Sequence, residues 1–152
     1  MTDTDRDKEF GSLLLSKSTT LRQLFDEPDE EHKWVVEGMV AERSLNLLAA
    51  APKVGKSTPS RVLAFRVATG GTFLGRACTP SPVVYVAFED RQCDVKAHFR
   101  SLGATGDEAI RFVFPEPGKD INSLVPALAK GLDSPLIIID TLQRYIDAQD
   151  LN

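Results

Sequence analysis

The sequence predicts an α/β fold with a mostly parallel sheet, and two observations indicate this class. Apolar runs typical of strands alternate along the 152 residues with segments whose apolar residues recur at helical spacing. The strand-like runs at 83–88 and 135–140 are apolar almost throughout rather than at every second residue. Such runs are typical of parallel strands covered on both faces, so we expect helices on both faces of the sheet.

The composition limits the classes of function. Charged residues make up 26% of the chain and the net charge is −4, so the sequence lacks the broad basic surface of a self-sufficient nucleic-acid-binding protein. No apolar stretch approaches the roughly 18 residues of a membrane span. The charged start "MTDTDRDKEFG" has no apolar region of the kind found in secretory signals. We therefore expect a cytoplasmic protein that does not bind membranes.

The N-terminal part, residues 1–33, is predicted to be a polar segment with one short helix. The apolar residues of "TTLRQLF" (19–25) recur at helical spacing, and Thr19 or Thr20 is available as the N-cap. The domain that carries the function is expected at 34–152.

This domain begins with short elements. Residues 34–40, "WVVEGMV", predict an extended stretch, and the apolar run "LNLLAA" at 45–50 predicts a buried strand. A helix is expected in "STPSRVLAFRVATGG", ending at Gly70 and Gly71. The segment 72–82 contains two prolines and is expected to be a loop.

Four further elements complete the alternating pattern after the strand at 83–88. The segment "DRQCDVKAHFRSLG" places its apolar side chains on one helical face and ends at Gly103. Residues 110–114, "IRFVF", predict a strand, and residues 120–132 predict a helix capped by Asp120. The run "PLIIID" then predicts the last strand.

The stretch "APKVGKST" at 51–58 has the character of a phosphate-binding loop. The pattern G-x-x-x-x-G-K-[ST] stands between a strand and a helix; here Gly55, Lys56 and Ser57 match its second half, and Ala50 occupies the place of the first glycine. Such a loop curls backbone N–H groups around phosphates at a helix N-terminus. The context predicts a nucleotide phosphate site, with a plain strand–turn–helix connection as the alternative.

Two acidic strand ends follow this loop in the sequence. Ligands of open α/β sheets bind at the carboxyl ends of the strands, so Glu89 or Asp90 in "FED" (88–90) could orient a water for attack on a γ-phosphate. The alternative is that Asp90 caps the next helix. Asp140, at the end of "LIIID" (136–140), fits a carboxylate in a magnesium shell, or else a helix cap or turn former.

Together these segments resemble the RecA-like P-loop ATPases, and within them the hexameric helicases and related ATPases similar to plasmid RepA. The resemblance is carried, in order, by "WVVEGMV", "APKVGKST", "TGGTFLGR", "VVYVAFED" and "LIIIDTL", from Trp34 to the C-terminus. It implies a RecA-like P-loop NTPase core. Relatives continue past the last of these segments with further strands, DNA-contacting loops, a sensor residue and an arginine finger, so the domain is expected to be C-terminally incomplete.

The resemblance also implies ATP and Mg²⁺ as cofactors. Lys56 would contact the β- and γ-phosphates, Ser57 and Asp140 would hold magnesium, and Glu89 would polarise the attacking water. The expected phosphate cradle comprises Pro52, Lys53, Val54, Gly55, Lys56, Ser57 and Thr58.

Pro59 departs from what such a loop requires. If Lys56 opens the helix, Pro59 is its fourth residue, where it removes the first helical hydrogen bond and biases Thr58 away from helical geometry. We expect this proline to disturb the turn that aims N–H groups at phosphate and so to weaken nucleotide binding.

Two functions of different classes are compatible with these features. The first is an ATPase of the RecA-like helicase type, which would act on single-stranded DNA through a homo-oligomer or with a full-length relative. The second is a truncated nucleotide-binding interaction or regulatory module without turnover of its own. A small-molecule kinase ranks behind both, because the sequence shows neither a lid nor an acceptor site.

Overall fold

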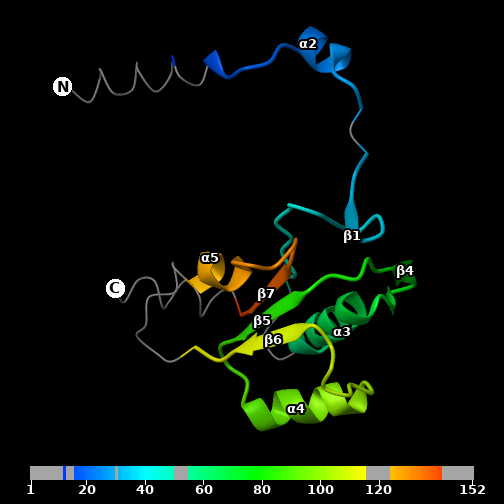
Figure 1. The fold of residues 1–152 in the computed structure, drawn as a ribbon, viewed down its shortest axis with the longest axis vertical. Helices are drawn as coiled ribbons and strands as arrows, with labels where there is room; N and C mark the ends of the chain where they lie inside the picture. Colours follow the sequence, from blue (N-terminus) through cyan, green and yellow to red (C-terminus); the bar gives the residue numbers. More distant parts are fainter. Residues whose placement is uncertain (1–11, 13–15, 30, 50–54, 116–123, 142–152) are drawn as a thin grey trace, which may run out of the picture. The chain divides into compact units, whose positions relative to one another are not determined.

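The chain divides into two compact units, residues 1–31 and residues 32–152. Figure 1 traces the elements of both units in this computed structural model. The described residues are 12, 16–29, 31–49, 55–115 and 124–141.

In the first unit the described helix is α2 (Leu21–Asp26), and its N-cap is Thr20. The Thr20 hydroxyl accepts from the backbone N–H of Gln23 at 3.3 Å, and the Gln23 side-chain oxygen accepts from the backbone N–H of Thr20 at 2.9 Å. This reciprocal pair satisfies two donors that a helix start leaves unpaired. The predicted helix and its cap are confirmed. Leu24 and Phe25 are 55% and 77% exposed, so local hydrogen bonding rather than packing defines this helix.

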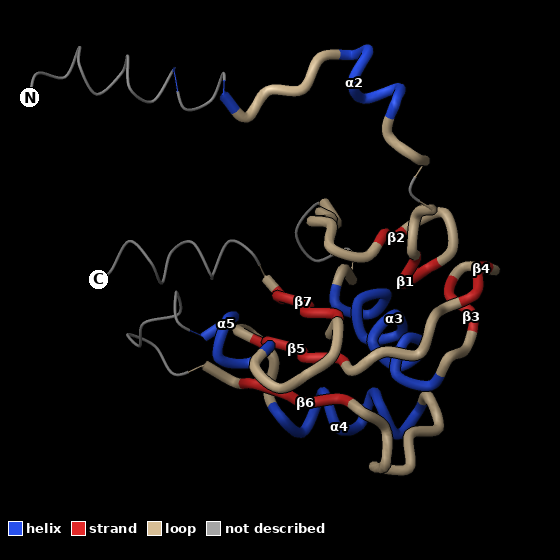
Figure 2. Tube along the Cα trace, turned by 45° about the horizontal axis from the view of Figure 1, so that its top comes forward, coloured by secondary structure: helices blue, strands red, loops and turns tan. Residues whose placement is uncertain are grey.

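The second unit is built on a parallel sheet, as the sequence predicted. Its described strands are β5 (Val83–Ala87), β6 (Ile110–Val113) and β7 (Leu136–Asp140), in the order β6-β5-β7. Val83 pairs with both Ile110 and Leu136, so the three strands start at the same level. Figure 2 shows β5 lying between its two neighbours.

The central strand β5 is buried on both faces. Tyr85 and Ala87 point to the face that carries the main core, and Val84 and Val86 point to the other face; Tyr85 and Val84 are both 0% exposed. Burial on both sides explains why the run is apolar throughout rather than alternating.

Helices α3 (Ser57–Thr69) and α4 (Gln92–Ser101) pack on the face that carries Tyr85. They contribute to one core with it, through Ala64, Phe65, Val67, Val95 and Phe99. Both helices were predicted, and α3 ends at Gly70 as expected. A third helix, α5 (Leu124–Ala129), lies within the predicted range 120–132, whereas the expected cap Asp120 lies outside the described residues.

The start of α3 corrects the expectation about Pro59. Lys56 is the N-cap and Ser57 the first helical residue, so Pro59 is the third. The first i→i−4 bond runs from the Ser60 N–H to the Lys56 carbonyl at 3.4 Å. The N–H groups of the first turn have no partner within a helix, so Pro59 removes none of the hydrogen bonds of α3. The prediction that Pro59 removes the first helical hydrogen bond is therefore wrong.

Two antiparallel hairpins precede β5. They pair β1 (Trp34–Val36) with β2 (Val40–Ala41), and β3 (Thr72–Phe73) with β4 (Arg76–Ala77). The second hairpin lies within 72–82, which was predicted to be a loop. The two hairpins are joined, because the Arg76 guanidinium donates to the Glu37 carbonyl at 2.9 Å and Val36 forms a bridge with Cys78.

The buried strand predicted at 45–50 is not formed by residues 45–49, the part of this run that the structure describes. Its described residues, 45–49, have no regular structure, and Leu45, Leu47 and Leu48 are 100%, 73% and 58% exposed. A strand exists only where a neighbour accepts its backbone hydrogen bonds. Among the described strands none pairs with this run, so its apolar composition alone does not order it.

Gly70→Ala should destabilise the second unit. Gly70 ends α3 with φ +68°, and a Cβ there would lie 2.7 Å from Cγ of Pro80. Left-handed backbone costs a residue with a Cβ about 1–2 kcal/mol, and the contact with the proline ring adds to this.

The matched control is Gly103→Ala, since Gly103 has φ +89° after α4 but no atom within 4 Å of the added Cβ. Equilibrium unfolding in denaturant should show a larger loss of unfolding free energy for Gly70→Ala than for Gly103→Ala. Equal losses would show that the Pro80 contact relaxes without cost.

Candidate functional site

The carboxyl ends of β5 and β7 form one edge that gathers the predicted acidic residues. Ala87, the last residue of β5, is in register with Asp140, the last residue of β7. The backbone N–H of Phe88 extends this pairing by donating to the Asp140 carbonyl at 2.8 Å. Glu89 follows directly, so the structure places Glu89 and Asp140 at the same edge of the sheet.

The Asp140 carboxylate has a buried partner that sequence analysis missed. The Tyr85 hydroxyl donates to Oδ2 of Asp140 at 2.6 Å, and the two residues are 0% and 7% exposed. Burial raises the pKa of the Tyr85 phenol far above its usual range, and the hydrogen bond to Asp140 and its negative charge raise it further. Tyr85 is therefore a protonated hydroxyl at neutral pH and acts as a donor.

A second polar pair joins helix α3 to the turn after β5. Nη2 of Arg61 lies 2.5 Å from Oδ2 of Asp90, with the two side chains 10% and 23% exposed. Burial alone would lower the pKa of Arg61, but the hydrogen bond and charge of Asp90, together with Tyr85, outweigh it and raise the pKa. The alternative that Asp90 caps the next helix is wrong, because the N-cap of α4 is Arg91.

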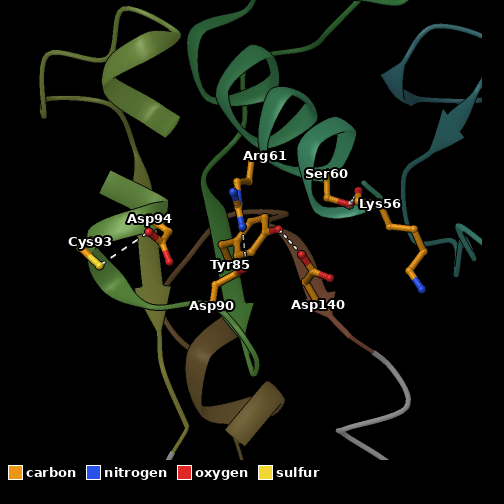
Figure 3. A network of polar contacts seen from close by, with 8 residues as sticks. All are labelled: Lys56, Ser60, Arg61, Tyr85, Asp90, Cys93, Asp94 and Asp140. Atoms are coloured by element: carbon orange, nitrogen blue, oxygen red, sulfur yellow. Dashed lines mark hydrogen bonds and ion pairs between the residues drawn. The ribbon is translucent and has the colours of Figure 1, made fainter. Parts of the chain in front are cut away.

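Figure 3 shows the two pairs next to each other. Arg61 reaches from α3 to Asp90, and Tyr85 reaches from β5 to Asp140, with Lys56 at the start of the same helix. The Nε atom of Arg61 is buried and has no hydrogen-bond partner among the described residues. The guanidinium is thus held mainly by its contact with Asp90.

The described part of the predicted phosphate loop begins at Gly55. Gly55 has φ +84°, a value that favours glycine, and its carbonyl accepts from the N–H of Thr58 at 3.1 Å. Lys56 is the N-cap of α3, without a side-chain capping bond, and Ser57 and Thr58 form the first turn. The other predicted cradle residues, Pro52, Lys53 and Val54, and the departure Ala50 lie outside the described residues.

Both missed residues left a trace in the sequence. Tyr85 is the single polar side chain within the otherwise apolar strand β5. Arg61 precedes Ala64 and Phe65 at helical spacing, so it belongs to the buried face of α3 rather than to its solvated face. A polar group inside an apolar pattern requires a partner, although the pattern does not identify the partner.

The donor set suits magnesium held together with a phosphate ligand. Among the described residues no group of three His, Cys, Asp or Glu side chains comes together to hold a metal unaided. Asp140 and Ser57 offer a carboxylate and a hydroxyl oxygen, the hard donors that Mg²⁺ takes alongside water and substrate phosphates. The oxygen chemistry of these two residues is compatible with a magnesium ion that takes its remaining ligands from water and phosphate.

Comparison with known proteins gives one match. A family model described as an AAA domain matches residues 13–152. No curated protein and no solved structure matches the chain. Across the part of the chain that the structure describes, no helix combines the length and apolar character needed to cross a bilayer.

Asp90→Asn should lower the free energy of unfolding by about 1.5–3 kcal/mol, because it removes the negative charge that compensates the Arg61 guanidinium and leaves only a weaker hydrogen bond to a neutral oxygen. The control is Asp94→Asn in the exposed first turn of α4, which should cost less than about 1 kcal/mol. Denaturant titrations of both variants test this, and an equal effect would mean that the Arg61–Asp90 pair contributes no more than a surface charge.

Proposed function

The chain belongs to the AAA domain family, and from this premise we propose that it is a RecA-like P-loop ATPase that hydrolyses ATP with Mg²⁺. The family indicates a nucleotide-binding ATPase. The finer proposal is supported by one observation: the Arg61–Asp90 pair attaches α3, which starts at the Gly55-Lys56 turn, to the sheet edge that carries Glu89 and Asp140.

Nucleotide binding is assigned to the start of α3. The N–H groups of a helix start and the positive end of its dipole favour phosphate. Lys56 supplies the positive charge for the β- and γ-phosphates. Pro52, Lys53, Val54 and Gly55, with Ser57 and Thr58, complete the proposed cradle.

Hydrolysis is assigned to the sheet edge. Glu89 orients the attacking water, and Asp140 and Ser57 hold the magnesium ion, which neutralises charge on the phosphates when it is bound. Glu89 comes shortly after β5, which is hydrogen-bonded to a strand on each side. The backbone near Glu89 is therefore held by the sheet and not by a long loop. Catalysis then depends on positioning and electrostatic stabilisation.

The partner follows from the helicase-type resemblance. We propose single-stranded DNA, contacted through a homo-oligomer or together with a full-length relative, since the net charge of −4 does not favour binding by the isolated chain. The second candidate is a regulatory module that binds nucleotide without turnover. Phosphate release from ATP, measured with and without single-stranded DNA, separates the two.

Lys56→Ala should lower the affinity for magnesium-ATP by about 10- to 100-fold, the equivalent of one charged hydrogen bond of about 1.5–3 kcal/mol. Calorimetric titration measures this, with circular dichroism to verify the fold. Lys96→Ala on the exposed side of α4 is the matched control. Wild-type affinity in Lys56→Ala would remove the phosphate site from this loop.

Glu89→Gln should leave magnesium-ATP affinity near that of the wild type and reduce turnover by about 10²–10⁴-fold, because the shape remains while the group that polarises water is lost. Single-turnover phosphate release is the measurement, with Glu37→Gln, exposed in the first hairpin, as control. Persistent turnover in Glu89→Gln would assign the water to another residue.

A further inference from the structure

Tyr85 is chemically distinct from the strand around it. Among the described residues it is the largest fully buried side chain, and its neighbours along β5 are Val83, Val84, Val86 and Ala87. A phenol hydroxyl in such surroundings costs free energy unless it is hydrogen-bonded. Phenylalanine would fill the same volume without that requirement, so the hydroxyl itself calls for an explanation.

The sheet register directs this hydroxyl to one atom. Tyr85 pairs with Ile138, and Asp140 lies two residues further along β7, so both side chains emerge on the same face as diagonal neighbours. The separation of 2.6 Å between the Tyr85 hydroxyl and Oδ2 of Asp140 is that of a hydrogen bond to a charged oxygen.

The ring of Tyr85 has little freedom to move. Its centroid lies 5.9 Å from that of Phe112 on β6, and Phe112 lies 5.0 Å from Phe99 on α4 with the rings nearly perpendicular. The aromatic side chains therefore fix the phenol, and the phenol in turn fixes the orientation of the carboxylate. Oδ2 is engaged by Tyr85, and within the described part of the chain Oδ1 forms no hydrogen bond or ion pair, so Oδ1 is the oxygen that can receive another ligand.

We propose that Tyr85 is a positioning residue that holds Oδ2 of Asp140 and thereby presents Oδ1 to the magnesium ion that enters with the nucleotide. This inference rests on the proposed function. Removing a group that hydrogen-bonds to a metal ligand and orients it commonly lowers metal affinity by about 10- to 100-fold. The role of Tyr85 is thus in the coupling between metal and nucleotide, not in contact with either.

The test compares two titrations on the full chain and on Tyr85→Phe. In the first, Mg²⁺ is added at a fixed concentration of a slowly hydrolysed ATP analogue; in the second, the analogue alone is added in the presence of EDTA. Tyr85→Phe should raise the magnesium midpoint by about 10- to 100-fold and leave the metal-free affinity unchanged. An unchanged midpoint in Tyr85→Phe overturns the inference.

Val86→Ala is the matched control, because Val86 is a buried neighbour on β5 whose side chain points to the opposite face. It should lower stability without moving the magnesium midpoint. An equal shift in both variants would show that general destabilisation is the cause, and would overturn the positioning role. If wild-type nucleotide affinity does not depend on Mg²⁺, the proposed function itself fails, and the role of Tyr85 fails with it.

A second measurement does not depend on the folding of Tyr85→Phe. The chain contains two tyrosines, Tyr85 and Tyr145, so labelling with 3-fluorotyrosine gives two fluorine resonances, which Tyr145→Phe assigns. Adding Mg²⁺ to the complex with the ATP analogue should shift the Tyr85 resonance. A metal ion bound to Asp140 withdraws electron density from the carboxylate and so changes the hydrogen bond that Tyr85 donates to it. A resonance that stays in place while magnesium binds would overturn the inference.

Discussion

The complete burial of β5 is the constraint on which the rest of the site depends. None of its five residues is more than 3% exposed, and its backbone is paired with β6 on one side and β7 on the other. A polar side chain buried here without a hydrogen-bond partner would lower the free energy of unfolding by about 1–3 kcal/mol. Tyr85 meets this demand at Asp140, so the burial of one strand determines where the carboxylate of the next strand points.

The Arg61–Asp90 pair makes the second connection, between helix and sheet. Removing two charges from water is costly, and a partly buried pair of this kind is weak evidence for stability. Its geometric effect is direct, since the ion pair joins a residue of α3 to a residue in the turn that follows β5. Because Lys56 starts the helix that carries Arg61, the proposed phosphate end and the acidic edge belong to one connected body.

The sequence predicted elements whose pattern is local and failed where the structure depends on distant neighbours. The strands β5 and β7 were predicted from their apolar runs, and α3 from its apolar face and from Gly70, which ends it. The equally apolar run at 45–49 forms no strand, because none of the described strands pairs with it. The hairpin of β3 and β4 escaped prediction, since strands of two residues are too short to show a period. The partners Arg61 and Tyr85 were missed for a related reason: a pattern shows that a buried polar group needs a partner but not which residue supplies it.

The residue at which α3 begins decides whether Pro59 disrupts the helix. Pro59 would break a helix that began earlier, but as the third residue of α3 it fixes φ where no helical hydrogen bond is lost. Proline at a compatible position also restricts the unfolded chain, which favours the folded turn. The N-cap of α3 is Lys56, whose side chain makes no capping hydrogen bond, whereas a serine or aspartate at this position would supply an acceptor for the first N–H groups. The proline thus removes no hydrogen bond from α3, and Gly55, with φ +84°, begins the turn that the Thr58 N–H closes before Pro59.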